Sequence, residues 1–163
     1  MKQGVEVRDG VAFLEVGDTL LCLWQAPASR DRWLHQMNRM EIMAATRPDG
    51  FLCVDLILAE SSPPDAALRQ QMQADFRRLG TKLRRFVAVP LGDSIWLSIV
   101  RTIVRGTLLL SGQSSRQRVT ATVSRALEEI RAAGGPETPA LPKLEQAVAV
   151  LFAALGVALP RVA

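Results

Sequence analysis

The sequence predicts an α/β protein with a mixed, mainly parallel β-sheet, covering helices and an extra apolar helix at its C-terminal end. Three short runs are apolar almost throughout, which is typical of strands buried on both faces of a sheet. They are Thr19–Trp24, Phe51–Ala59 and Phe86–Val89. Segments with helical periodicity separate these runs, and strands that alternate with helices form parallel sheets through right-handed crossovers.

The N-terminal region predicts an antiparallel edge for this sheet. Residues 4–9 and 11–16 alternate between apolar and polar side chains around the pair Asp9-Gly10. This pair favours a tight hairpin turn, because glycine adopts positive φ without steric cost. Gly17-Asp18 forms a second turn of similar type before the first fully apolar run.

Two helices are predicted between the three apolar strands. Ser29 caps the first, and Pro48-Asp49-Gly50 ends it. Ser62 caps the second, with Pro63 at its first position, and this helix extends from about Pro63 to Leu83. The apolar stripe of the first helix consists of Trp33, Met37, Met40 and Ala44.

The remaining segments complete the predicted domain at residues 1–133. Asp93 or Ser94 caps a helix over Ile95–Leu110, and a short strand, Gln117–Ala121, follows. Thr122 caps a helix over Val123–Ala133. Glycine and proline then mark residues 134–141 as a linker, and residues 142–163 form the apolar C-terminal helix, which is interrupted by Gly156.

Composition excludes several classes of protein. With 163 residues, 48% of them hydrophobic and 22% charged, the chain is long and apolar enough for one folded domain. Two cysteines are too few for a disulfide scaffold, and one histidine is too few for a histidine-based metal site. Cys22 and Cys53 lie in apolar runs, which predicts buried, reduced thiols in a cytoplasmic protein.

Neither a transmembrane segment nor a nucleic-acid partner is expected. The longest apolar run, Ala147–Pro160, has 14 residues, whereas a spanning helix needs about 20. The start of the chain has no apolar core of a signal peptide. The net charge of +4 is modest, and no aromatic residue lies among the arginines on the polar face of the helix at Pro63–Leu83, since Phe76 belongs to its apolar face.

The sequence shows no motif that carries chemistry. Glycine-rich phosphate loops, zinc-ligand spacings and paired carboxylates are absent, so we expect no enzyme, no cofactor, no metal and no catalytic residue. Asp55 interrupts an apolar strand and is either a structural acid with its own hydrogen-bond donors or a functional buried carboxylate. His35 has no obvious acidic partner in the sequence and is not expected to act as a catalytic base.

Three stretches together resemble the STAS domain, the fold of bacterial anti-sigma-factor antagonists, and its relatives described as STAS or Sec14-like. They are Cys53-Val54-Asp55-Leu56, Ile99–Leu108 and Arg118–Ile130. The resemblance covers residues 4–133 and implies a STAS-like sheet and a regulatory, protein-binding role. Pro63-Pro64 stand where the antagonists carry an Asp-Ser-Ser-Gly turn with a phosphorylated serine, so the resemblance does not carry the kinase switch over.

Three surfaces are candidates for function. Ser61 and Ser62 precede the predicted helix as possible phosphorylation sites, although Ser62 serves equally as its cap. A basic face is a candidate for an anionic partner, or is simply solvated. This face comprises Arg69, Arg77, Arg78, Lys82, Arg101 and Arg105. The C-terminal helix is apolar around most of its circumference, so it either forms a homodimer interface or lies in a groove of its own domain. Its candidate interface residues are Leu144, Val148, Leu151, Phe152 and Leu155.

Two functions follow as expectations. The first is a non-enzymatic, STAS-like regulatory module in signalling that acts through protein–protein contacts, as a homodimer, in a bacterial cytoplasm. The alternative is a module that binds a small apolar molecule or lipid in a pocket between the sheet and the helices. A pocket in that position favours the alternative, whereas a filled core favours the first function.

Overall fold

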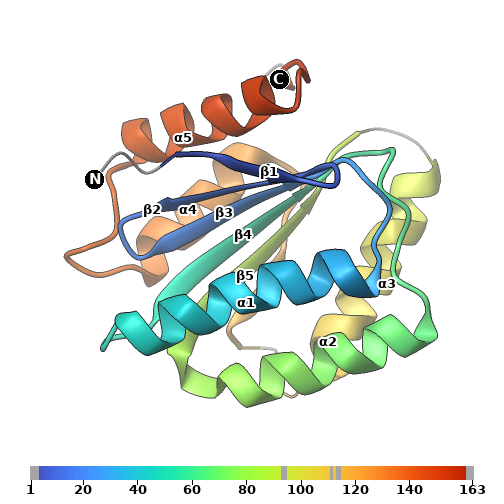
Figure 1. The fold of residues 1–163 in the computed structure, drawn as a ribbon, viewed down its shortest axis with the longest axis horizontal. Coiled ribbons are helices and arrows are strands. Elements are labelled where there is room, and N and C mark those ends of the chain that lie inside the picture. The colour runs from blue at the N-terminus through green and yellow to red at the C-terminus, as the bar shows by residue number, and fades with distance from the viewer. Residues whose placement is uncertain (1–3, 93–94, 111, 113–114, 161–163) are drawn as a thin grey trace.

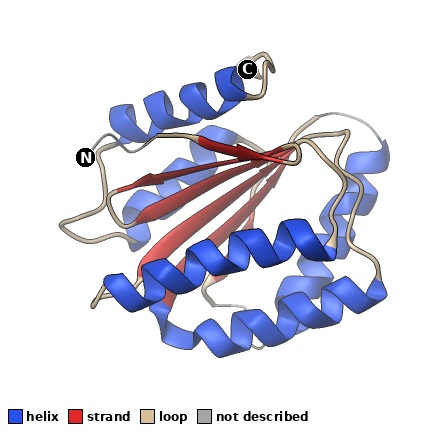
Figure 2. Ribbon diagram, in the orientation of Figure 1, coloured by secondary structure: helices blue, strands red, loops and turns tan. Residues whose placement is uncertain are grey.

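The computed structural model describes all residues of the chain except 1–3, 93–94, 111, 113–114 and 161–163. In the described part of the chain, six strands form one sheet in the order β1-β2-β3-β4-β5-β6 (Figures 1 and 2). The strands are Glu6–Arg8 (β1), Val11–Val16 (β2), Thr19–Trp24 (β3), Phe51–Ile57 (β4), Leu83–Pro90 (β5) and Gln117–Val119 (β6). The α-helices are Arg30–Thr46 (α1), Ala66–Leu79 (α2), Ile95–Leu110 (α3), Val123–Ala133 (α4) and Leu141–Ala154 (α5).

The sheet is mixed, and its antiparallel part is larger than predicted. The first two pairings, β1 with β2 and β2 with β3, are antiparallel, and the next three pairings are parallel. The α/β class is therefore confirmed, but the description as mainly parallel is wrong, because the N-terminal strands pair as a three-stranded meander. The hairpin turn predicted at Asp9-Gly10 is present, with φ of 49° and 78° at the two residues.

The direction of the crossovers decides which helices cover which face. The crossovers through α1, α2 and α3 each add the next strand in the same direction along the sheet. Because such connections are right-handed, all three helices lie on one face. The chain then crosses over, and α4 and α5 cover the other face (Figure 1). On that face α5 packs on β2 and β3, and α4 packs on β4 and β5.

Both faces of the central strands are buried, as the apolar runs predict. All six residues of β3 are buried. Along β4, Phe51 and Cys53 face the side of α1 and α2, whereas Leu52 and Val54 face α4 and α5. This alternation divides the apolar core into two layers separated by the sheet.

The C-terminal helix α5 belongs to the second layer. Leu144, Val148, Leu151 and Phe152 are at most 2% exposed and pack with the sheet residues of that layer. Pro142 occupies the first turn, but the helix ends at Ala154, so its predicted continuation is wrong for residues 155–160, and residues 161–163 lie outside the described part of the chain. Gly156 stops it by adopting φ of +66°, a conformation that favours glycine.

The segment between α4 and α5 is held to the sheet by a buried carboxylate. Asp18, which is 2% exposed, accepts a hydrogen bond from the Thr138 hydroxyl at 2.8 Å. Arg84 of β5 forms an ion pair with the same carboxylate. Gly17 lies so close to the carbonyl of Glu137 that an added Cβ would be 2.3 Å from it. These contacts attach the predicted linker to the turn between β2 and β3 and, through Arg84, to β5.

Other predicted boundaries shift by a few residues. Ser29 and Thr122 cap α1 and α4 as predicted. The cap of α2 is Asp65 and not Ser62, because Asp65 accepts a hydrogen bond from the Leu68 amide at 2.8 Å. Asp93 and Ser94, the predicted caps of α3, lie outside the described residues. In the described part of the chain, every helix is too short or too polar to cross a membrane.

The packing of α5 predicts the effect of truncating one side chain. Leu151→Ala should lower the free energy of unfolding by about 2–5 kcal/mol, because Leu151 is fully buried. Val150→Ala on the same helix is the control: Val150 is 43% exposed, so the change should stay within about 0.5 kcal/mol. Urea denaturation of both variants measures the difference, and equal effects would contradict the position of α5.

Candidate functional site

A hollow opens between the sheet and helices α1, α2 and α3, at the carboxyl ends of the parallel strands. Its interior offers about 60 Å³, and the whole hollow with its open mouth encloses about 640 Å³. Loops after the parallel strands diverge at this end of an α/β sheet, which is where such proteins usually bind ligands. Here the loops after β3 and β4 meet at the mouth, where the Ala28 amide donates to the Ser62 carbonyl at 3.1 Å. We call this hollow the pocket.

The pocket is almost entirely apolar. Its lining comes from β3, β4 and β5, from the three helices on that face and from the loops at the mouth. The lining residues are Trp24, Ala28, Trp33, Asp55, Ile57, Ser61, Ser62, Pro63, Pro64, Leu68, Met72, Phe86, Ala88, Val100, Val104 and Thr107. An apolar wall with very few polar groups is typical of small-molecule sites.

Two tryptophans contribute rings to this wall and direct their N–H groups into internal hydrogen bonds. Trp24 Nε1 donates to Gln36 Oε1 at 2.9 Å. Trp33 Nε1 donates to the buried carboxylate of Asp75 at 2.8 Å. Because both N–H groups are satisfied within the protein, the indoles can present apolar surface to the pocket.

Asp55 supplies the charge-bearing group of the pocket. It lies on β4 and is only 5% exposed. Gln36 of α1 donates an amide N–H to its Oδ1 at 2.7 Å, and the Cys53 thiol lies 3.7 Å from the same oxygen. Among the residues that the structure describes, no lysine, arginine or histidine contacts this carboxyl. An acid so deeply buried usually has a cationic partner.

Burial governs the protonation of Asp55. Loss of hydration raises the pKa of its carboxyl from the ordinary value of 3.8 to about 7, although hydrogen bonds from Gln36 and the two cysteines act in the opposite direction. The carboxyl is therefore neutral in mildly acidic solution and ionises near neutral pH. A cation that enters the pocket would favour the ionised form.

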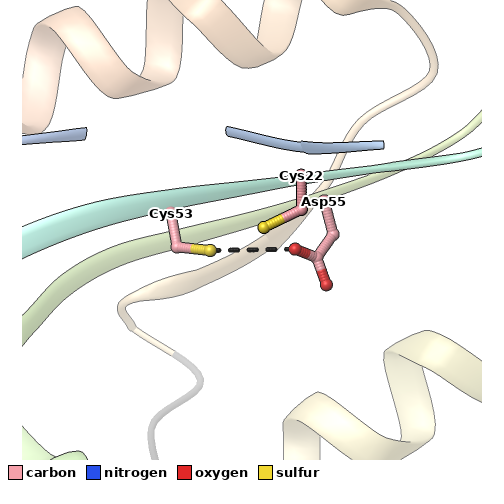
Figure 3. A group of neighbouring side chains, drawn as sticks. All are labelled: Cys22, Cys53 and Asp55. Atoms are coloured by element: carbon pink, nitrogen blue, oxygen red, sulfur yellow. Dashed lines mark hydrogen bonds between the residues drawn. The ribbon is translucent and has the colours of Figure 1, made fainter. Parts of the chain in front are cut away.

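Cys22 and Cys53 lie next to this carboxyl, and Figure 3 shows all three side chains directed toward one another. One ligand atom from each residue, sulfur or oxygen, lies within 4.8 Å of the other two. Burial raises the pKa of Cys53 to about 11 and that of Cys22 well above its ordinary value. Both thiols are buried and free of disulfide bonds, as predicted, and together with Asp55 they are the described residues that could hold a metal ion.

The pairing of β3 with β4 creates this cluster. Cys53 and Asp55 are two residues apart on β4, so both side chains point to the same face. Cys22 is directly opposite Asp55 in the parallel register, which adds the second thiol. The two-residue spacing was visible in the sequence, but the register that brings in Cys22 was not, and the sequence analysis missed the cluster.

The two predicted phosphorylation sites lie at the mouth of the pocket. Ser61 is 3% exposed, and Ser62 is half-buried with its carbonyl bonded to Ala28. Neither serine is at the N-terminus of α2, because Asp65 occupies the cap. A phosphate on either serine would therefore not occupy the cap position of α2.

The predicted basic face is largely engaged within the chain. Arg69 donates to the carbonyl of Pro64 at 2.9 Å, and Arg77 donates to that of Leu110 at 2.6 Å. Arg78 pairs with Asp75 at 2.8 Å, and Lys82 donates to the carbonyl of Pro48 at 3.0 Å. Arg105 is exposed on α3, whereas Arg101 is half-buried. The structure does not gather these six side chains around a common cavity.

The residues predicted to form an oligomer interface are buried within their own domain. Leu144, Val148, Leu151 and Phe152 are covered by their own sheet and by α4, and Leu155 is partly buried beside them. The second arrangement considered for this helix, a groove of its own domain, is the one observed. His35, in contrast, has the acidic partner that the sequence did not indicate, since Glu6 lies 3.6 Å from its Nε2.

Comparisons with known protein-family models, curated proteins and solved structures return no match to this chain. The STAS resemblance therefore stays a prediction.

The buried acid predicts a pH-dependent stability. In the unfolded chain Asp55 loses its proton near pH 4, but in the folded chain it keeps the proton to about pH 7. Between these values the folded state binds more protons, so the contribution of Asp55 to stability falls as pH rises and is lowest above pH 7. Asp55→Asn has no such titration. The variant should therefore gain on the order of 4 kcal/mol relative to the parent chain between pH 4 and 8.

Urea denaturation of both proteins across this pH range, with EDTA present, measures that difference. A difference that does not change with pH would show that the carboxyl is already ionised or already hydrated in the folded chain.

Proposed function

We propose that this protein is a non-enzymatic binding module for a small, mainly apolar molecule that carries one amine or hydroxyl group. The single observation that carries this proposal is an apolar pocket with one nearly buried carboxyl in its wall. The apolar wall provides binding energy through burial of the ligand surface. The carboxyl orients the ligand, because it accepts a hydrogen bond from the polar end of that molecule.

The hydrogen bonds of Asp55 support a donor as the preferred polar group. Gln36 and Cys53 both approach Oδ1 of this carboxyl, the Cys22 thiol also bonds to it, and the residue itself lines the pocket. A carboxylate has about four acceptor positions, so Asp55 keeps acceptor capacity for a ligand. A protonated amine satisfies both needs of this carboxyl, since it donates hydrogen bonds and supplies the missing positive charge.

The size of the pocket limits the ligand class. An enclosed volume of about 60 Å³ is smaller than the roughly 150 Å³ of a cavity that holds benzene. The ligand must therefore extend through the mouth between the loops that join at Ala28 and Ser62, or open the pocket as it enters. A slender alkyl or arylalkyl amine fits this shape better than a broad ring system. The free, buried thiols support action in a reducing compartment such as the cytoplasm.

A binding experiment tests this proposal with matched probes. Arylalkyl amines and arylalkyl carboxylic acids of equal size are titrated into the chain by calorimetry in EDTA. The amines should bind more tightly than the acids. The described lining of the pocket contains the Asp55 carboxyl and no lysine, arginine or histidine. Asp55→Asn should weaken amine binding at least about tenfold, the effect of losing one charged hydrogen bond. Glu60→Gln is the control, because it removes an exposed carboxylate that does not line the pocket, and it should change binding little.

A second variant blocks the pocket without changing its charge. Ala88 lines the wall on β5, so Ala88→Leu should fill part of the interior and weaken binding of every probe. Native mass spectrometry of the purified parent chain should also show any ligand retained from the cell. Equal binding by the parent, Asp55→Asn and Ala88→Leu would rule out this pocket as the site.

The second candidate is the STAS-like protein-interaction module, acting as a homodimer. The α5 residues that were predicted to form the dimer interface are buried. The observation that favours a homodimer is instead the exposed apolar surface of α3. Ile99, Leu109 and Leu110 are 48%, 65% and 64% exposed there. Ile99 and Leu110 are about three helical turns apart, so they share one face. Exposed apolar side chains arranged in this way mark interfaces.

Sedimentation of the full chain tests this candidate. The parent chain should sediment as a dimer, and the double variant Ile99→Glu/Leu110→Glu should sediment as a folded monomer, because two charges cannot be buried at an apolar contact. A parent chain that is monomeric at all concentrations would remove the homodimer.

A further inference from the structure

We propose that Cys22, Cys53 and Asp55 form a three-donor binding site for a thiophilic divalent cation of the Zn²⁺ type, with its fourth coordination position open to the pocket. The site draws on β3 and β4, two central strands that are buried on both faces. It does not depend on the proposed small-molecule ligand, because its two thiols lie outside the pocket lining and only Asp55 belongs to both sites.

The distances among the donors are close to those of a metal site. Zn–S bonds of about 2.3 Å and Zn–O bonds of about 2.0–2.2 Å give tetrahedral donor separations of roughly 3.6–3.8 Å. The Cys53 sulfur lies 3.7 Å from Asp55 Oδ1, and no pair of donors is more than 4.8 Å apart. Small side-chain rotations close the remaining gap of about 1 Å, since the sulfur atoms lie at the ends of rotatable bonds.

The donor types select the cation. Two thiolates favour soft or borderline metals over Mg²⁺ and Ca²⁺, which prefer oxygen. The carboxylate adds a harder donor that suits Zn²⁺ better than Cu⁺. A divalent cation with two thiolates and one carboxylate has a net charge of −1. This charge is much less costly to bury than three separate anions. Each thiol releases its proton to solvent when its sulfur coordinates the ion.

Gln36 supplies the outer support that metal ligands usually have. Its Nε2 lies 2.7 Å from Asp55 Oδ1 and 3.8 Å from Cys53 Sγ, so one amide donates toward two of the three donors. Trp24 fixes the orientation of this amide by donating to its Oε1 at 2.9 Å. Donors of this kind orient the ligands and offset their negative charge.

The open position follows from the location of Asp55 in the wall. Cys22 and Cys53 are fully buried, whereas Asp55 reaches the pocket surface. An ion held by the three donors is therefore approached from the pocket side, by a water molecule or by a nitrogen or sulfur atom of a bound molecule. A site with three protein ligands and one open position is typical of accessible zinc centres.

Titration of the reduced full-length chain with Co²⁺ tests the proposal. Co²⁺ should bind once per chain with a thiolate-to-metal charge-transfer band in the near ultraviolet and the visible bands of tetrahedral coordination, and Zn²⁺ should displace it. The charge-transfer band separates this site from binding at His35 or Glu6, which have no thiol. Bound Zn²⁺ should also raise the melting temperature.

Variants assign the donors. Cys22→Ala and Cys53→Ala should each weaken the charge-transfer band, and the double variant should abolish it, whereas Asp55→Asn should weaken Zn²⁺ binding at least about tenfold. Gln36→Leu should weaken it about 10–100-fold through loss of the outer donor. Asp18→Asn is the matched control, because it removes another buried carboxylate at the sheet and should leave the affinity unchanged. If the cysteine variants do not fold, Asp55→Asn and Gln36→Leu carry the test.

Three results would overturn the site. They are the absence of the charge-transfer band in the folded parent chain, equal affinity of Asp55→Asn and the parent, and unfolding of the chain by the metal. None of them affects binding of amine probes in EDTA, so the pocket proposal fails or succeeds separately.

Discussion

Burial of β3 and β4 on both faces is the constraint on which the rest of the structure depends. A sheet whose central strands are apolar on each side needs two covering layers. The crossovers through α1, α2 and α3 supply only one layer, because they all progress in the same direction along the sheet. The chain after β6 must therefore return across the other face, and this requirement explains why α5 is so apolar.

The pocket forms where the first layer does not fill the space above the sheet. Helix α2 begins only at Ala66, after the extended Pro63-Pro64 segment, so the mouth is framed by loops instead of a helix. Within this mainly apolar layer, β4 places one carboxyl in the pocket wall, and β3 and β4 each add one thiol. Such a polar cluster breaks the apolar pattern of the core, and no cationic side chain of the described chain lies against its carboxyl. Local conflicts of this kind are often found at binding sites.

Much of the fold was predictable because its signals are local. Apolar runs identified the buried strands, Asp9-Gly10 identified the hairpin, and Ser29 and Thr122 identified two helix starts. The site was less predictable because it depends on register. Nothing within Thr19–Trp24 indicates that Cys22 is opposite Asp55. The position of α5 also could not be read locally, since an apolar helix has the same pattern whether it covers its own sheet or a partner.

The two indole rings at the pocket have a practical consequence. Trp24 and Trp33 are two of the three tryptophans in the chain, and both contact the same hollow. Gln36 and Asp75 hold their N–H groups, so the rings keep their orientation while the medium in front of them changes. Indole emission responds to local polarity. The two rings therefore form an intrinsic fluorescent reporter, and we expect the wavelength of their emission to shift when a molecule enters the hollow.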